Sequence, residues 1–365
     1  MNVLWDLRLF SYGYRNRGVG RYCKELIGAI LSRKPEMTLY VWADRGLVPE
    51  SLREERIRWI PYSGGTWKKS IVTLPWLVLR HHIHLIHYWV ALGPLRQIGI
   101  APFSPAPAVA TVYDLGVELW DTPYLNYMRS EMSWRMQKRF FRSVKGWQAI
   151  SQATLDDLSA FFPHRHVARD VIYMPLNAER KLPSAKNERA RYFITLAGSP
   201  HKNCSRVVAA FAKIRVRYPD WQLKILGELN GEEEGVPDLP EGVVHDPSMD
   251  RYEEHLMRCG GLVYCSVNEG LGVPAIDAMQ YGCPLLLSSI PSLKEICSGV
   301  AVFADPLSVD SMAQGMEVLV KERQQWESRS KEGADVYRRK GLDAPDRCLE
   351  MYGKITGCRV SFNIR

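Results

Sequence analysis

The feature that most constrains the fold of this 365-residue chain is the alternation of short apolar segments with helix-forming stretches. Such an alternation predicts β–α–β units, in which helices connect parallel strands. A first set of segments predicts a helix over residues 20–32 and strands over residues 3–6, 38–43, 84–88 and 108–112. A second set predicts strands over residues 192–197, 221–227, 261–265 and 284–288. At this length we expect two α/β domains, each with a parallel sheet.

The segment between the two sets, residues 177–191, is rich in Lys, Arg, Glu, Asn and Ser and has no hydrophobic period. This composition is typical of a connection between domains. We therefore expect a first domain over residues 1–176, a linker over 177–191 and a second domain over 192–342. Residues 343–358 have a helical pattern, so residues 343–365 are expected to form a C-terminal helix and tail.

The composition is that of a soluble globular protein, with 46% hydrophobic and 24% charged residues. The eight cysteines form no CxxC and no zinc-like pairs, which favours reduced cytosolic thiols. The N-terminus lacks a signal-peptide pattern, and the longest apolar run, residues 71–79, is too short to span a bilayer. These features predict a cytoplasmic protein and leave peripheral membrane contact open.

The basic residues are concentrated in the first half of the chain. Residues 1–180 contain 24 Lys and Arg against 15 Asp and Glu, a net charge of +9, whereas residues 181–365 contain 24 against 25, a net charge of −1. Nucleic acid and anionic lipid both attract such a basic half. Because the sequence contains no nucleic-acid-binding motif, we expect an anionic membrane surface as partner and no nucleic acid.

Two segments favour this membrane contact. Residues 128–147 interleave basic and aromatic side chains, and a Trp-Lys-Lys triplet precedes the apolar run at 71–79. Basic and aromatic residues on one helix suit a contact in the plane of the membrane interface. The alternative is an ordinary surface helix whose aromatic side packs inward. The residues expected to contact a membrane or an acceptor are Arg135, Lys138, Arg139, Arg142, Trp67, Lys68 and Lys69.

The segment 268–279 places two carboxylates, Glu269 and Asp277, on either side of a glycine-rich turn. Pro274 suits the first position of a helix, and Gly282 suits its end. A helix N-terminus offers unpaired N–H groups and a positive dipole, which together bind phosphate. A loop carboxylate, a closely approaching backbone and a helix start therefore predict a site for a nucleotide-sugar.

This segment resembles the E-x7-E motif of glycosyltransferase family 4 (group 1), whose members are retaining enzymes with the GT-B fold. The resemblance continues, in the family's order, at residues 5–8, 18–22, 111–115, 149–151, 171–177 and 198–203. It implies two Rossmann-like domains with parallel sheets that face each other across a cleft. It also implies that the C-terminal helix crosses back to the first domain.

The resemblance implies a role for each matching residue. Glu269 is expected to bind hydroxyls of the donor sugar, Asp277 the ribose, and Lys202 the diphosphate, where its ammonium would stabilise the leaving group. Asn203 is also expected to cap the following helix. Gly18 and Gly20 are expected on a loop after the first strand, where their backbone approaches the ligand. The further residues expected at the donor are Gly198, His201, Asn203, Gly270, Leu271 and Gly272.

Three positions depart from the family pattern. Tyr113, expected among the catalytic residues with Glu269 and Lys202, stands where the family commonly has a His that contacts the donor sugar. A Tyr can still form a hydrogen bond there, but it does not titrate near neutral pH, which argues against an imidazole base. Asp277 replaces a Glu and is shorter by one methylene group. His201 stands where the family often has Arg and gives a weaker phosphate contact when neutral.

No metal site is expected. The histidines His81, His82, His84 and His87 form a cluster in the sequence, but on a strand they would point to two opposite faces and could not converge on one ion. The sequence also lacks a D-x-D signature. We therefore expect neither a metal nor another cofactor.

The resemblance implies a retaining glycosyltransferase that transfers a sugar from a nucleoside-diphosphate sugar to a glycan or lipid-linked acceptor. Its opening motifs resemble those of members that build lipopolysaccharide or capsule from GDP- or UDP-sugars at the inner face of the membrane. Two alternatives remain: a catalytically weak GT-B protein that acts as a nucleotide- and membrane-binding scaffold, and a GT-B sugar phosphorylase or epimerase.

Overall fold

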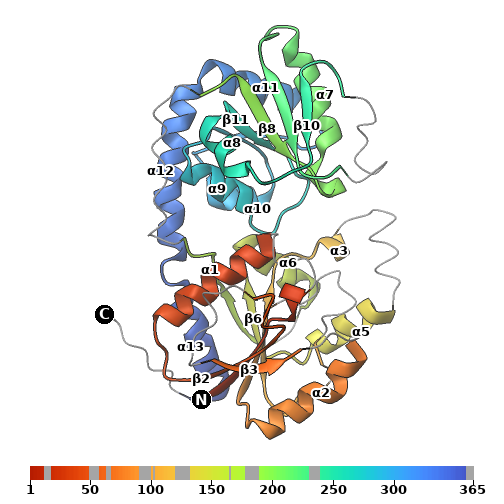
Figure 1. Ribbon diagram of the computed structural model, residues 1–365, viewed down its shortest axis with the longest axis vertical. Coiled ribbons are helices and arrows are strands. Elements are labelled where there is room, and N and C mark those ends of the chain that lie inside the picture. Colours follow the sequence, from red (N-terminus) through yellow and green to blue (C-terminus); the bar gives the residue numbers. More distant parts are fainter. Residues whose placement is uncertain are drawn as a thin grey trace. The chain divides into compact units, whose positions relative to one another are not determined.

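A computed structural model describes most of the chain, and its residues group into two compact units (Figure 1). The first unit consists of Met1–Asn177 and Lys340–Arg365, and the second of Ala178–Arg339. The described residues are 1–11, 18–48, 57–62, 67–89, 100–101, 103–119, 132–163, 166–176, 189–229 and 239–358. Most of the expected linker, residues 177–188, lies outside them.

The first unit contains a parallel sheet, which within the described residues has seven strands in the order β3-β2-β1-β4-β5-β6-β7. These strands are β1 Asn2–Asp6, β2 Thr38–Ala43, β3 Ile57–Pro61, β4 Leu85–Tyr88, β5 Ala108–Val112, β6 Gly146–Ala149 and β7 Ala168–Val171. The helical elements are η1 Arg8–Ser11, α1 Gly18–Ser32, α2 Trp67–Arg80, α3 Gly116–Leu119, α5 Met132–Phe141 and α6 Gln152–Phe161. The central strands are buried along their length because helices connect them, as in other parallel sheets.

The second unit repeats this architecture with six strands in the order β10-β9-β8-β11-β12-β13, again within the described residues. They are β8 Tyr192–Leu196, β9 Gln222–Leu226, β10 Val243–Asp246, β11 Gly261–Tyr264, β12 Leu285–Ser288 and β13 Val302–Ala304. The helical elements are η4 Pro200–Lys202, α7 Cys204–Arg215, α8 Tyr252–Arg258, α9 Val273–Gln280, α10 Pro291–Cys297, α11 Val309–Lys321 and α12 Arg323–Gly341. The predicted α/β class with two parallel sheets is confirmed.

The last helix, α13 Ala344–Thr356, packs in the first unit against α1, β6 and β7, as predicted for a C-terminal helix that crosses back. Its Tyr352 is fully buried there. The Tyr352 hydroxyl accepts a hydrogen bond from Trp5 Nε1 at 3.1 Å and lies 2.5 Å from His87 Nδ1. His87 Nε2 in turn lies 2.8 Å from the Thr111 hydroxyl. A hydrogen-bonded row therefore connects α13 to three neighbouring strands of the sheet.

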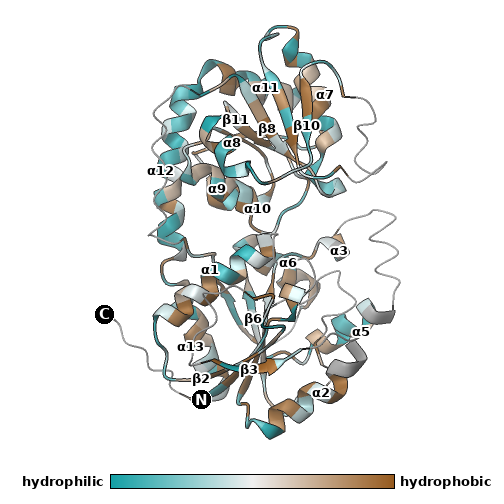
Figure 2. Cartoon of the chain, viewed as in Figure 1, coloured by the Kyte–Doolittle hydropathy of each residue, from teal (hydrophilic) through white to brown (hydrophobic). Residues whose placement is uncertain are grey.

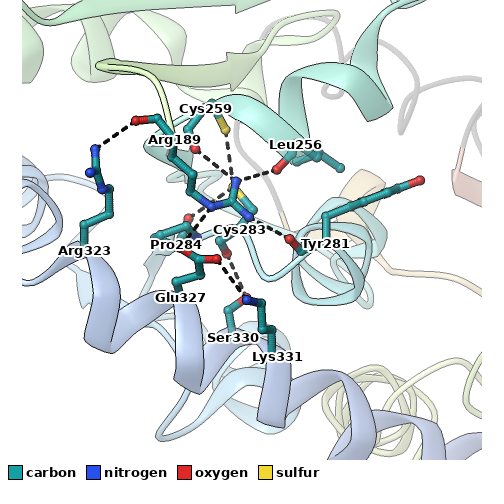
Figure 3. Close-up of polar contacts among 10 residues, drawn as sticks. All are labelled: Arg189, Leu256, Cys259, Tyr281, Cys283, Pro284, Arg323, Glu327, Ser330 and Lys331. Atoms are coloured by element: carbon teal, nitrogen blue, oxygen red, sulfur yellow. Dashed lines mark hydrogen bonds and ion pairs between the residues drawn. The ribbon is translucent and has the colours of Figure 1, made fainter. Parts of the chain in front are cut away.

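A buried arginine near the start of the second unit forms hydrogen bonds with the ends of two of its helices (Figure 3). Arg189, which the composition places in the linker, is only 4% exposed. Its guanidinium donates to the carbonyl oxygens of Leu256, Cys259 and Tyr281 at 2.8, 3.1 and 2.6 Å and lies 3.5 Å from a Glu327 carboxylate oxygen. A buried charge requires such partners. The composition cannot show this role, because a linker arginine and a buried one look alike in the sequence.

Replacing His87 by Gln is expected to flatten the dependence of stability on pH. Burial lowers the pKa of His87 from 6.5 to about 3. Between these values the unfolded chain binds a proton that the folded chain excludes, so stability falls as pH falls through this window. For this one group the slope reaches about 1.4 kcal/mol per pH unit, and no penalty remains above the unfolded pKa. Urea unfolding measured between about pH 4 and 7 gives the slope.

The exposed His82 supplies the control for this measurement. It has a positive φ of 48°, which Asn adopts readily, so His82→Asn should retain the steep dependence. Equal slopes in the native protein and His87→Gln would contradict the role assigned to His87.

Candidate active site

A cluster of polar residues forms in the second unit, where β8 and β11 end. These two strands are neighbours in the sheet, so their carboxyl ends lie side by side. β8 leads into η4, which carries Lys202, and β11 leads into a loop that carries Glu269 and continues into α9. Ligands of open α/β sheets bind at this edge, outside the carboxyl ends of the strands.

Lys202, Glu269 and Tyr264 form the centre of the cluster. Lys202 Nζ lies 2.8 Å from Glu269 Oε1 and donates to the Tyr264 hydroxyl at 2.6 Å. The ammonium nitrogen also lies 4.7 Å from the centre of the Tyr264 ring. The side chains of Lys202 and Glu269 are 18% and 12% exposed. The structure thus brings together two residues that the sequence assigns to the donor, 67 positions apart.

The surroundings keep Glu269 ionised. Burial alone would raise its pKa, but the charges of Lys202 and His201 and hydrogen bonds from Lys202 and Tyr264 outweigh burial and lower the pKa below its ordinary value. The pKa of Tyr264 is raised well above its ordinary value, chiefly by burial and then by the Glu269 charge. At neutral pH the cluster therefore contains an ammonium, a carboxylate and an uncharged phenol.

His201 lies beside this centre. Its Nε2 is 3.8 Å from Glu269 Oε1, and its Nδ1 is 2.9 Å from the Ser199 hydroxyl. The Val267 N–H donates to the His201 carbonyl oxygen at 2.9 Å, which connects the loop after β8 to the loop after β11. These contacts place an imidazole next to the Lys202–Glu269 pair.

Asn203 does not cap α7 with its side chain, contrary to the prediction. It stands at the N-cap position with a left-handed φ of 63°, and its side chain makes no cap hydrogen bond. The amide Nδ2 instead donates to the carbonyl oxygens of Cys265 and Pro306 at 3.0 and 2.7 Å. Its Oδ1, the atom that would accept the capping hydrogen bond, accepts one from Arg206 Nη1 at 2.9 Å instead. The two carbonyl oxygens satisfy the buried Nδ2, which would cost free energy if it were unpaired.

Glycines shape the backbone around the cluster. Gly198 has a φ of +116°, and a Cβ built on it would meet no heavy atom within 4 Å, so open space lies beside this backbone. Gly272 has a φ of +83°, and a Cβ there would lie 2.3 Å from a Leu293 side-chain carbon. Gly270 is half-buried and Leu271 buried. Only glycine suits positions 198 and 272, for conformation at both and for space at the second.

The helix α9 begins at Val273, one residue earlier than predicted, so Pro274 is its second residue and not its first. Gly282 follows the helix with a φ of 60°, as expected of a helix end. Asp277 lies in the middle of α9 and is 5% exposed, and its Oδ1 accepts a hydrogen bond from Gln280 Nε2 at 3.4 Å. Its contact with a ribose remains a prediction.

The expected donor contacts of the first unit differ from their prediction. Gly18 and Gly20 lie in α1 and not on a loop. The helix thus begins two residues before the predicted start at Gly20. Tyr113 is 8% exposed, and its hydroxyl lies 2.9 Å from the buried Cys23 sulfur. Its contact with a sugar remains a prediction.

The helix α5 packs its aromatic side inward, as in the alternative considered for this segment. Trp134 and Phe141 are buried, and the Trp134 indole N–H donates to Glu118 Oε1 at 2.5 Å. Lys138 also pairs with Glu118, at 2.8 Å. Among the expected membrane residues of this region, Arg135, Arg139 and Arg142 are exposed. The side chains of Trp67, Lys68 and Lys69, at the start of α2, lie outside the described residues.

The histidine cluster is dispersed in the structure. His81 and His82 follow α2 in a turn, His84 precedes β4, and only His87 lies on the strand, so the assumption of one continuous strand is wrong. His84 Nδ1 accepts a hydrogen bond from the Asn2 N–H at 3.1 Å. Within the described ranges no three His, Cys, Asp or Glu side chains are grouped as metal ligands. In the same part of the chain, no helix has the length and apolarity needed to cross a bilayer.

Tyr264 is the member of the centre that the sequence does not single out. It is the last residue of β11, in a run of apolar strand residues, and nothing in its spacing distinguishes it from a core tyrosine. Its position immediately before the Glu269 loop is the one signal that could have indicated it.

The fold and this site define a class of protein. Solved structures that share the fold over almost their full length include a sucrose-phosphate synthase from Thermosynechococcus elongatus (TM-score 0.73, 16% identity, 98% of this chain and 99% of that chain). They also include WaaG, a glycosyltransferase involved in lipopolysaccharide biosynthesis (TM-score 0.69, 14% identity, 98% and 100%). HepE of Anabaena, solved in complex with UDP and glucose, has a TM-score of 0.71 at 15% identity, with 97% and 100% covered. The fold is the two-domain GT-B fold of glycosyltransferases.

Two family models match successive parts of the sequence. Residues 16–180 match Glycosyltransferase Family 4, and residues 178–336 match Glycosyl transferases group 1. The chain therefore belongs to the family 4, group 1 glycosyltransferases, in agreement with the resemblance found in the sequence.

Curated relatives match parts of the chain. The O-antigen chain mannosyltransferase RfbU of Salmonella typhimurium is 26% identical over 191 residues, 47% of this chain and 52% of its own length. An MMP α-(1→4)-mannosyltransferase of Mycolicibacterium hassiacum is 30% identical over 241 residues, 60% and 56%. The serotype-specific mannosyltransferase WbdA of Escherichia coli is 25% identical over 198 residues, 51% and 23%. The matches thus span about half the length of the first two relatives and less of the third.

Replacing Lys202 by Met tests the central ion pair. The change leaves Glu269 largely buried without its cation, so the pKa of Glu269 should rise and stability at neutral pH should fall by about 2–3 kcal/mol. The deficit should shrink at acid pH, where the variant's Glu269 is protonated, because a carboxylate with a lowered pKa stabilises only above that pKa. Carboxyl-carbon NMR gives the pKa, and urea unfolding gives the stability.

Lys213 provides the matched control. It pairs with Asp310 at 2.5 Å, but the two side chains are 53% and 74% exposed. Lys213→Met should therefore cost less than about 1 kcal/mol. Similar losses in the two variants would show that the Lys202 pair behaves as an ordinary surface pair.

Proposed function

We propose that the protein is a retaining glycosyltransferase that moves a sugar from a nucleoside-diphosphate sugar to a glycan or lipid-linked acceptor. The observation that carries the proposal is the contact of Lys202 with Glu269 and Tyr264 at the ends of β8 and β11. An ammonium group in a largely buried site binds a diphosphate, and an ionised carboxylate accepts hydrogen bonds from sugar hydroxyls. Membership of the glycosyltransferase family supports the same reaction.

In this reaction the bond between the anomeric carbon and the diphosphate oxygen breaks. The acceptor oxygen forms its bond to the same face of the sugar, and its proton passes to the departing diphosphate oxygen. Lys202 and His201 would stabilise the charge that develops on the diphosphate, while Glu269 would position the sugar and Asp277 the ribose. Because side chains supply this positive charge, we propose that the reaction needs no divalent metal.

The relatives favour a mannosyl donor. RfbU, WbdA and the M. hassiacum protein are mannosyltransferases, and two of these names refer to O-antigen or serotype-specific products. HepE, in contrast, is solved with UDP and with UDP-glucose. We therefore propose a GDP- or UDP-sugar as donor, GDP-mannose first, and a cell-surface polysaccharide or lipopolysaccharide as product.

A peripheral contact with the inner face of the membrane completes the proposal. Trp134 and Phe141 of α5 are committed to the core, and the exposed basic residues described in this region are Arg135 and Arg139 on the helix and Arg142 just after it. The helix α2, coloured largely brown in Figure 2, instead exposes Val72, Trp76 and Leu79. A basic unit with an exposed apolar helix face suits an anionic bilayer.

Donor turnover tests the proposed reaction. The purified protein, incubated with GDP-mannose or UDP-glucose and an isoprenoid-phosphate-linked glycan, should release nucleoside diphosphate. Glu269→Gln should lower the rate by roughly 10²–10³-fold, because a positioned charge at the reacting sugar is lost. Excess EDTA should leave the native rate unchanged, and NMR of the product should show the anomeric configuration of the donor.

Glu254→Gln is the matched control, since Glu254 is a surface carboxylate paired with Arg251 and Arg258. It should turn over donor at the native rate. A protein that binds nucleotide but turns over no donor, with binding unchanged in Glu269→Gln, would contradict the proposal and favour the scaffold alternative.

A further inference from the structure

The first unit contains a pocket of about 530 Å³ between the edge strand β3 and helix α2. This volume lies in the range of sites that bind small molecules. Four aromatic residues line it, Tyr40 and Trp42 from β2, Trp59 from β3 and Trp76 from α2. The pocket belongs to neither the proposed donor site nor the sequence motifs of the family.

The mouth of the pocket continues into an apolar surface. Trp76, a wall of the pocket, is 55% exposed, and Val72 and Leu79 on the same helix are 75% and 65% exposed. Their spacing of four and three residues places them on one face of α2. Trp59 pairs in register with Val41, so its side chain lies on the face of the sheet opposite to Tyr40 and Trp42, and its indole does not face the pocket. The pocket is therefore an apolar space that opens beside an apolar face.

Positive charge gathers at one end of this pocket. The exposed Arg58 donates to the Tyr40 hydroxyl at 3.0 Å, and the guanidinium carbon of Arg80 lies 5.3 Å from the Trp76 ring. The His81 ring lies 5.0 Å from the Tyr40 ring. The pKa of His81 is lowered, first by burial and then by the charges of Arg80 and Arg58. Among the lining residues there is no carboxylate.

We propose that this pocket binds an anionic phospholipid of the membrane, with a hydrocarbon chain against Trp42 and Trp76 and the phosphate on Arg58 and Arg80. Aromatic walls and an exposed apolar rim match a hydrocarbon chain, and two arginines beside a lining that contains no carboxylate among the described residues match a phosphate. A neutral glycan would gain nothing from the two cations. Free phosphate would gain nothing from the aromatic walls.

This inference rests on the proposed function only in the choice of a membrane as the source of the lipid. It adds one specific site to the proposed peripheral contact. The lipid would hold α2 at the bilayer by chain insertion as well as by surface charge, and its binding would not require donor or acceptor.

Single-chain probes test the pocket. Isothermal titration calorimetry of the full chain with hexyl phosphate and octyl phosphate, below their micelle concentrations, should show saturable binding. Affinity should rise with chain length, by up to about fourfold per added methylene. Inorganic phosphate and octyl glucoside should bind at least tenfold more weakly than octyl phosphate, because each lacks one half of the ligand.

Two matched pairs of variants locate the binding. Thr73 lines the pocket and the adjacent Val72 does not, so Thr73→Phe should fill the space and lower octyl phosphate affinity at least tenfold, whereas Val72→Phe should not. Arg58→Gln should weaken binding about tenfold, whereas Arg139→Gln on α5 should not. If Thr73→Phe fails to fold, Trp76→Ala removes an exposed wall and should lower the affinity instead. The melting temperature of each variant verifies folding.

Several results would overturn the inference. These are equal affinity for inorganic phosphate, tight binding of a neutral mannose oligosaccharide displaced by octyl phosphate, or unchanged affinity in both Thr73→Phe and Trp76→Ala. Because the titration contains no nucleotide-sugar, a failure of glycosyl transfer would leave its result unaffected. The two proposals can therefore fail separately.

Discussion

The ion pair between Lys202 and Glu269 joins the loop after β8 to the loop after β11, although the two residues are 67 positions apart in the sequence. Each residue alone would be a largely buried charge, and the 2.8 Å contact compensates both. Two further hydrogen bonds connect the same loops: the Val267 N–H donates to the His201 carbonyl oxygen, and the Asn203 side-chain amide donates to the Cys265 carbonyl oxygen. The proposed donor site therefore has its cation and its carboxylate in place before a ligand arrives, which is the condition for catalysis by positioning.

Buried polar groups also join distant segments elsewhere in the chain. His87, Thr111, Trp5 and Tyr352 connect α13 to the first sheet, and Arg189 connects the beginning of the second unit to α8, α9 and α12. In both places the polar atoms have partners from several elements, so no one element can leave without exposing a buried donor or acceptor. Buried hydrogen bonds thus stabilise the packing of the C-terminal helix against the first sheet.

The sequence predicts the central strands well and the edges poorly. Residues 38–43 and 108–112 form strands with the predicted limits, because uninterrupted apolar runs identify strands buried on both faces. β3 and β10 have no such runs, since Arg58 and His245 interrupt their patterns, and β13 is apolar but only three residues long. Edge strands need only one buried face, so they are recognised by alternating apolar and polar residues. These strands are too short for such an alternation to be recognised.

In the proposed donor site, the sequence likewise indicates some residues but not the contacts between them. Lys202 and Glu269 stand in recognisable loops, so their types and motifs indicate them. Their mutual contact, and the part of Tyr264 in it, depends on β8 and β11 being neighbours, which no spacing within the sequence contains. The side-chain partners of Asn203 and Tyr113 likewise come from residues 62 and 90 positions away.

The two candidate membrane segments show why composition alone cannot locate a surface. In α5, basic and aromatic residues alternate, yet Trp134 and Phe141 face the core while Arg135 and Arg139 are exposed. The helix α2 is apolar on nearly all sides: Leu74, Leu77 and Val78 fill the core, while Val72, Trp76 and Leu79 are left exposed. A helix of fourteen residues needs only one apolar stripe to pack on a sheet. The second stripe of α2 is therefore unnecessary for the fold, and a contact outside the fold gives it a physical reason.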